Sequence, residues 1–303
     1  MKNKLVIAIS IGLMLVFSGC DFIDPPYVYQ GPNGCNQPVP TFTPRTSPVK
    51  KVLIEDMTGH RCGNCPRAAE TIAQLRLAYP GQVIAIGLHS SLSGTFTEVY
   101  SSDTVTNPEL KFVYDFRTPV ATELDGLTFL STSGSLPNGY VNRKNYGGGS
   151  AVVGHTQWPA KVAAELALPQ QMDIQLYHYW TASDSNLCTY YFVEALMDLN
   201  ANYKICLFLI ENDIENWQKD YNESPSELED YIHEHVLRGS LNGTWGTVVS
   251  SNASILDNEQ FIDGFSIKIN TGAWDVNNLY VVAFVYNATT YEVIQAEEMK
   301  VIP

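Results

Sequence analysis

The sequence is poor in basic residues and in cysteine, and each shortage excludes a class of protein. Its 303 residues hold 18 Lys and Arg against 32 Asp and Glu. Such a chain has no basic stripe to neutralise phosphates, which argues against a nucleic-acid partner. Six cysteines are too few for a dense disulfide scaffold. Apolar residues make up 45% of the chain, which is ample for a packed core.

The N-terminal apolar run is typical of an export signal. Lysines precede Leu5–Phe17, and these 13 residues are too few to span a bilayer as a mature helix. The following Ser18-Gly19-Cys20 completes a segment that resembles the lipobox of bacterial lipoproteins. The resemblance implies that residues 1–19 are a signal peptide and that Cys20 is lipidated and anchors the chain in a membrane. The alternative is a plain secretory peptide that ends near a cysteine.

An exported chain enters an oxidising envelope, where disulfides persist. Residues 21–49 contain seven prolines, which favour extended backbone, so we interpret residues 20–49 as a tether that follows the lipid anchor. Cys35 lies within the tether. If Cys20 carries lipid, five cysteines remain, and at least one is unpaired within the monomer.

Residues 50–169 alternate between apolar strand-like runs and helical patterns. Apolar residues at 68, 72, 75 and 79 follow helical spacing, and Pro80-Gly81 ends the pattern. The predicted elements are a strand at 51–55, a helix at 66–79, a strand at 82–88, short helices at 108–114 and 119–124, strands near 140–141 and 151–153, and a helix at 158–168. A strand–helix–strand unit, then a hairpin and a closing helix, resembles the thioredoxin-like α/β fold.

Residues 170–303 have a different sequence pattern, in which runs of aromatic and β-branched residues are separated by Asn, Asp, Gly and Ser. The predicted strands are 172–180, 189–196, 203–210, 261–269, 280–286 and 293–297. A helix is predicted after Ser224, because Ser224 and Glu227 have capping-box spacing. We expect an all-β domain of the immunoglobulin-like sandwich type.

The segment Cys62-Gly63-Asn64-Cys65 lies between a predicted strand and a predicted helix. A helix N-terminus favours thiolate at Cys62, and Cys65 can resolve a mixed disulfide, so the pair fits thiol–disulfide exchange. A structural Cys62–Cys65 disulfide is the main alternative. A metal site is disfavoured because two further ligands are lacking; His233 and His235 do not have i,i+4 spacing. We predict neither a metal nor a cofactor.

The surroundings of the two cysteines resemble the thioredoxin active site. Asp56 stands where the family has a buried acid, and Pro137 stands where it has a cis-proline. The resemblance implies that Asp56 accepts a proton for Cys65 and that Pro137 presents backbone to a substrate. Arg61 departs from the family's Trp and, with His60 if it is protonated, would further stabilise thiolate at Cys62.

Other candidate residues have plainer interpretations. Cys188 and Cys206 lie in apolar runs that a tight turn would place out of register, so both are expected to be buried free thiols. His233 and His235 are expected in a turn or at the surface. Glu55 is expected to be a charge at the end of a strand.

Four segments resemble the outer membrane protein 28 (Omp28-related) family. They are EDMTGHRCGNCPRAAE, SLPNGYVNR, HEHVLRGSLNGTWG and VVAFVYNATTYEVIQAEEMKV. The resemblance implies a lipid-anchored outer-membrane or surface protein, without an established reaction. Two functions remain open. The chain is either a thiol–disulfide oxidoreductase acting on exported or surface proteins, or a surface binding or adhesion protein in which Cys62–Cys65 is structural.

Overall fold

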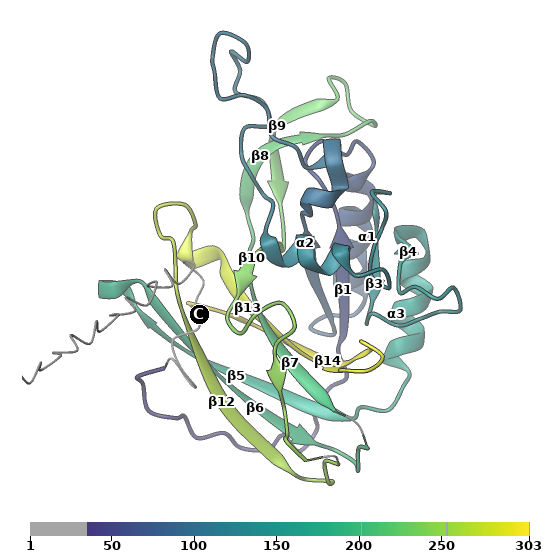
Figure 1. Cartoon of the computed structure of the whole chain (residues 1–303), viewed down its shortest axis with the longest axis vertical. Helices are drawn as coiled ribbons and strands as arrows, with labels where there is room; N and C mark the ends of the chain where they lie inside the picture. Colours follow the sequence, from purple (N-terminus) through teal and green to yellow (C-terminus); the bar gives the residue numbers. More distant parts are fainter. Residues whose placement is uncertain (1–34, 201, 253, 303) are drawn as a thin grey trace, which may run out of the picture.

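The computed structural model describes residues 35–200, 202–252 and 254–302 (Figure 1). The helices are α1 (Cys65–Ala78), α2 (Pro119–Gly126) and α3 (Trp158–Leu166). The first strands are β1 (Val52–Met57), β2 (Val83–Leu88), β3 (Asn138–Val141) and β4 (Val153–Gly154). The later strands are β5 (Met172–Thr181), β6 (Asn186–Ala195), β7 (Tyr203–Glu211), β8 (Ile214–Lys219), β9 (Glu227–His233), β10 (Val236–Ser240), β11 (Thr247–Val248), β12 (Gln260–Lys268), β13 (Leu279–Asn287) and β14 (Val293–Lys300).

One mixed sheet runs through both halves of the chain. Its order is β14-β13-β7-β10-β2-β1-β3-β4, with β11 beside β7. β1 and β2 are parallel and are connected by α1, whereas β3 and β4 pair antiparallel. β10 joins the halves because it is parallel to β2 and antiparallel to β7. The predicted domains 50–169 and 170–303 therefore share a sheet, and their division remains a prediction.

Side-chain alternation along the strands distributes residues among three cores. Val52 and Ile54 of β1 pack with α1 and α3, whereas Leu53 belongs to the core that includes α2. β7 likewise alternates between that second core and a third one, which lies against the separate sheet β12-β6-β5. The result is a sheet-rich α/β architecture, with β5, β6 and β12 forming a layer at one end of the molecule (Figure 1).

Most predicted elements are confirmed, and two helices are wrong. The predicted helix 119–124 is α2, but residues 108–114 form turns, in which Leu110 and Phe112 have φ values of 51° and 53°. Such left-handed backbone interrupts a helix. The segment after Ser224 forms β9, which pairs antiparallel with β8. Sheet pairing outweighs the local capping signal there, as expected for a weak helix propensity.

The described part of the proline-rich segment, residues 35–49, is attached to the β5–β6–β12 layer. Cys35 forms a disulfide with Cys188 of β6. The rings of Phe42 and Phe192 stack with centroids 5.5 Å apart. The prediction that Cys188 is a free thiol is therefore wrong, because a segment distant in sequence supplies its partner. Cys206 is buried and free, as predicted.

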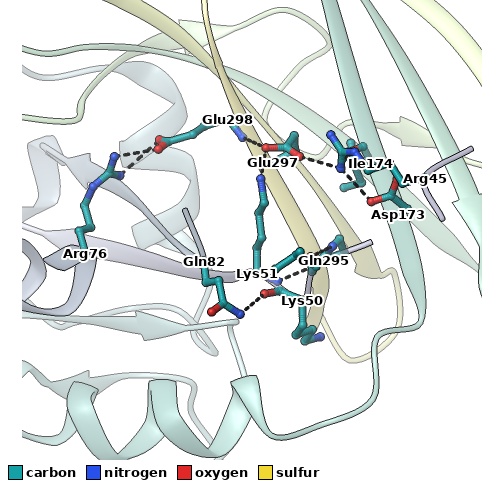
Figure 2. Close-up of polar contacts among 11 residues, drawn as sticks. Arg45, Lys50, Lys51, Arg76, Gln82, Asp173, Ile174, Gln295, Glu297 and Glu298 are labelled. Atoms are coloured by element: carbon teal, nitrogen blue, oxygen red, sulfur yellow. Dashed lines mark hydrogen bonds and ion pairs between the residues drawn. The ribbon is translucent and has the colours of Figure 1, made fainter. Parts of the chain in front are cut away.

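Polar contacts join this segment, the start of β1 and the end of α1 to β14 (Figure 2). Arg45 Nη1 lies 2.9 Å from Asp173 Oδ1 and 3.1 Å from Glu297 Oε2. Lys51 also pairs with Glu297. Arg76 Nη2 of α1 lies 2.8 Å from Glu298 Oε1. Ion pairs thus supplement the shared sheet in joining the two halves.

Glu55 is part of the interior and does not mark an exposed strand end. Its carboxylate accepts two hydrogen bonds from Arg143, of 2.6 Å from Nε and 2.5 Å from Nη2. Both side chains are buried, and the Arg143 guanidinium also lies 4.8 Å from the centroid of the Phe284 ring. The expectation for Glu55 was wrong because its partner follows β3, 88 residues along the chain.

Candidate functional site

The loop between β1 and α1 places Cys62 and Cys65 at the N-terminus of the helix. The Cys62 N–H donates to the Gly59 carbonyl at 2.9 Å, and the Cys65 N–H donates to the Cys62 carbonyl at 3.1 Å. A Cβ at Gly59 would lie 2.4 Å from the Phe96 carbonyl oxygen, so the loop requires glycine there. Pro66 occupies the first turn of α1, where its missing N–H costs no helical hydrogen bond.

The predicted disulfide between Cys62 and Cys65 is present, with a Cα–Cα distance of 5.4 Å. Both cysteines are almost fully buried, with exposed fractions of 1% and 2%. This burial is a property that the spacing of the cysteines did not predict. Any exchange partner must therefore reach the sulfurs through an opening or after a local movement.

The hairpin β8–β9 covers the disulfide loop, and we refer to residues 214–233 as the cover hairpin (Figure 1). The Tyr221 N–H donates to the Gly63 carbonyl at 2.9 Å, and Gln218 Nε2 donates to the Cys62 carbonyl at 3.1 Å. A Cβ on Gly63 would lie 2.6 Å from the Tyr221 ring. An ion pair of 2.5 Å between Arg67 of α1 and Asp220 also connects the cover hairpin to the helix.

Asp56 lies near the end of β1, and its side chain is buried with 4% of its surface exposed. Within the described residues, its Oδ1 has no hydrogen-bond partner. Burial raises the pKa of Asp56 to about 8, because ionisation in an apolar setting is costly. The side chain is therefore mostly a protonated carboxyl at neutral pH.

Pro137 precedes β3, and the Leu136–Pro137 peptide bond is cis, as the resemblance predicted. The antiparallel register sets Gly139 opposite Asp56 and Asn138 opposite Met57. Pro137 therefore comes to the end of the sheet at which β1 leads into the disulfide loop. The catalytic roles predicted for these residues remain proposals.

A cavity of about 260 Å³ lies between α1 and the cover hairpin. Asp56 and Cys65 line it, whereas Cys62 does not. The other lining residues are Thr58, Pro66, Ala69, Glu70, Ile72, Ala73, Gly87, His89, Gln218, Tyr231, Ile232, His233, Glu234, His235 and Val236. The structure thus joins one predicted cysteine and the predicted acid to a cavity that the sequence did not reveal.

Histidines form much of this region, and their surroundings correct two predictions. Burial lowers the pKa of His60 and of His89, and lowers the pKa of both His233 and His235 to about 3. His60 is therefore neutral at pH 7 and cannot stabilise thiolate as an imidazolium. His233 is buried, not in an exposed turn, and its ring centroid lies 4.6 Å from that of Phe116. His235 is half-buried in the bend between β9 and β10, in agreement with the prediction of a turn. The position of His233 shortly before the apolar β10 was the only sequence signal for its burial.

Arg61 contacts the 91–100 loop, and its predicted effect on a Cys62 thiolate remains a prediction. Its Nη1 donates to the Glu98 carbonyl at 3.2 Å and pairs with Glu98 Oε2 at 3.2 Å. Its guanidinium carbon lies 4.1 Å from the centroid of the Tyr100 ring. Through these contacts the Arg61 guanidinium holds the 91–100 loop beside the disulfide loop.

No group of three or more His, Cys, Asp or Glu within residues 35–200, 202–252 and 254–302 is placed to hold a metal ion. Cys206, the free cysteine in this part of the chain, is buried, and burial raises its pKa to about 12. It is unsuited to nucleophilic chemistry at neutral pH.

The observations define a sheet-rich α/β protein with a covered CxxC disulfide. A sequence model described as outer membrane protein Omp28 matches residues 130–303, more than half of the chain, and the chain therefore belongs to this family. The predicted outer-membrane location is confirmed by that membership. The match does not include the disulfide loop. No curated protein matches the chain in sequence.

Two solved structures from Porphyromonas gingivalis are among those that are similar to this chain. HBP35 of Porphyromonas gingivalis has a TM-score of 0.60 and 15% identity, covering 84% of this chain and 76% of that chain. A domain of the outer membrane lipoprotein Omp28 from Porphyromonas gingivalis has a TM-score of 0.29 and 17% identity, over 44% of this chain and 90% of that chain. The first likeness shows a shared fold.

Among the described residues, no helix is long and apolar enough to cross a membrane. The predicted signal peptide 1–19 and the predicted lipidation site Cys20 lie outside the described residues.

Proposed function

We propose that the protein exchanges disulfides in the outer envelope, with residues 50–169 acting as a thioredoxin-like domain and residues 170–303 as an immunoglobulin-like sandwich. The observation that carries the proposal is that Cys65, of the Cys62–Cys65 disulfide, and Asp56, whose buried Oδ1 has no hydrogen-bond partner among the described residues, line one cavity. The element order β1-α1-β2, followed by the pair β3–β4 and by α3, supports the thioredoxin-like interpretation.

Each residue has a defined role in the proposed exchange. A partner's mixed disulfide forms when Cys62 thiolate attacks the partner's disulfide and displaces one of its sulfurs. Cys65 thiolate then attacks Cys62, which releases the partner's second thiolate and restores the Cys62–Cys65 disulfide. The ionised form of Asp56, which is the minor form at neutral pH, takes up the proton that Cys65 loses, and Pro137 presents backbone to the partner strand. Electrons pass between sulfurs, so the reaction requires no cofactor.

Exported or surface proteins are the proposed partners, and lipid on Cys20 would hold the protein among them at the membrane. A protein partner must displace the cover hairpin, because Gln218 and Tyr221 bond to the disulfide loop. β8 and β9 form a two-stranded sheet of their own, so the hairpin can open without breaking the main sheet, and such local opening costs less than global unfolding. The proposed reaction therefore includes opening of this hairpin.

A trapping experiment tests the proposal. In cells that express Cys65→Ser, Cys62 should remain joined to partner proteins through mixed disulfides, which a non-reducing gel and mass spectrometry would detect. The matched control is the Cys62→Ser, Cys65→Ser double variant, which has no nucleophile at the site. Equal patterns for the two variants would contradict the proposal.

The second candidate function is a surface binding protein in which Cys62–Cys65 is structural. The burial of both cysteines under the cover hairpin favours it. In that case the disulfide should resist millimolar glutathione in the folded protein, and no partner should be trapped. Fast reduction together with trapped partners would remove this alternative.

A further inference from the structure

The cavity beside Cys65 has room for a small molecule. A water molecule takes up about 30 Å³ in the liquid, so a cavity of about 260 Å³ can hold a molecule of amino-acid size. Ile72 and Val236 contribute apolar wall, and Ala69 and Ala73 of α1 line the cavity at solvent-exposed positions. The helix thus presents small side chains where a larger one would narrow the cavity.

Three buried polar atoms on residues that line the cavity, namely Asp56 Oδ1, His89 Nδ1 and His235 Nδ1, lack partners within the described residues. Asp56 and His89 are 4% and 3% exposed. Leaving such an atom unpaired destabilises the folded protein. These carboxyl and imidazole side chains give the cavity a partly polar wall, which suits it to a small polar ligand.

The two cysteines of the disulfide differ in their access to the cavity. Cys65 lines the cavity, whereas Cys62 is absent from the lining residues described. The Cys62 carbonyl accepts from Gln218, so the cover hairpin lies directly over that residue. While the cover hairpin is closed, a small molecule can therefore approach Cys65 through the cavity, whereas a protein cannot reach Cys62.

We propose that a small aminothiol, of the class of free cysteine, enters this cavity and exchanges with the disulfide at Cys65. The inference rests on the proposed function and names the small-molecule partner that would reset the site. An aminothiol fits because Glu70 and Glu234 are exposed residues on the lining, where their carboxylates attract an ammonium group.

The exchange balances in two steps. The aminothiol's thiolate attacks the Cys65 sulfur, the bond between Cys65 and Cys62 breaks, and Cys62 leaves as thiolate. A second aminothiol thiolate attacks the small molecule's own sulfur in this mixed disulfide, which releases a small disulfide and Cys65 thiolate. The protonated carboxyl of Asp56 then donates its proton to Cys65. The protein disulfide gains two electrons, and two small thiols are oxidised.

Narrowing the cavity tests the inference on the intact protein. Ala69→Leu and Ala73→Leu change exposed helix positions, and Ala78→Leu is the matched control because Ala78 is exposed on α1 but does not line the cavity. Reduction by free cysteine is followed by alkylation and mass spectrometry. We expect the double variant to be reduced about tenfold more slowly, a barrier increase of about 1.4 kcal/mol, and Ala78→Leu to match the wild type. Equal rates in all three proteins would overturn the inference.

Single-cysteine variants show which sulfur is attacked and separate this inference from the proposed function. With cystine, the small disulfide of cysteine, the remaining Cys65 of Cys62→Ser should react faster than the remaining Cys62 of Cys65→Ser. A long thiol-reactive polymer should show no such preference for Cys65. If Cys62 reacts faster with cystine and traps proteins, the proposed function stands and this inference fails. If neither cysteine reacts in folded protein, both fail.

Discussion

The free energy of unfolding of Asp56→Asn, measured relative to that of the wild type, should increase as pH rises. The native carboxyl is buried, and its Oδ1 is unpartnered within the described residues. Burial raises its pKa from 3.8 to about 8. The unfolded chain therefore releases this proton at lower pH than the native protein, so the contribution of Asp56 to stability falls as pH rises between these two values. An amide at this position does not titrate.

The magnitude follows from the two pKa values. Between pH 5 and pH 7, the unfolded carboxyl is ionised and the native one is largely protonated. Each pH unit in that window changes the free energy of unfolding by about 1.4 kcal/mol. The stability difference between Asp56→Asn and the wild type should therefore grow by about 3 kcal/mol over these two units. The buried histidines have their own pH dependence, but both proteins share it.

Urea unfolding followed by tryptophan fluorescence at several pH values measures this difference. Asp257→Asn is the control because it removes the same charge at an exposed loop position. Its difference from the wild type should not grow in this way. A constant difference between Asp56→Asn and the wild type from pH 5 to pH 7 would refute the reasoning, because Asp56 would then titrate alike in the native and unfolded states.

Three further substitutions test packing around the site by urea unfolding. Glu55→Gln leaves the buried Arg143 without its charge partner and should cost about 3–5 kcal/mol. Cys35→Ser opens a disulfide that closes 153 residues and should cost about 2–5 kcal/mol without reductant. Gly63→Ala forces the Tyr221 ring to shift and should cost about 1–3 kcal/mol, which Tyr221→Ala in the same chain should largely recover.

Each of these results can contradict its premise. A negligible cost for Glu55→Gln would mean that water reaches the guanidinium. An effect of Cys35→Ser that persists equally under reducing conditions would point to lost packing, not to the lost disulfide. If Tyr221→Ala fails to recover Gly63→Ala, the strain lies elsewhere than in the cover hairpin.

The local sequence pattern was enough to predict helices and strands whose apolar residues follow a regular spacing within the element. The helical spacing of Ala68, Ile72 and Leu75 predicted α1, and the apolar run at 83–88 predicted β2. The CxxC motif predicted the Cys62–Cys65 disulfide because residues three apart at a helix start are close whatever the rest of the fold does.

Features that depend on distant pairing could not be predicted in the same way. Glu55 acquires Arg143, and Cys188 acquires Cys35, from segments 88 and 153 residues away. The segment after Ser224 has a helical capping signal, yet β8 offers backbone partners that make it a strand. In each case the position of the partner is set by the tertiary arrangement of the chain. Local residue spacing carries no information about that arrangement.

The sequence by itself predicted an export signal and the family, and it determined which reactive groups are present at Cys62, Cys65 and Asp56. Only the tertiary structure decided access to that chemistry, because the cover hairpin comes from residues about 150 positions later and packs on the loop. It also created the cavity beside Cys65, whose walls come from five strands and α1. Reactivity depends on residue type, whereas access depends on which distant segments the fold brings together.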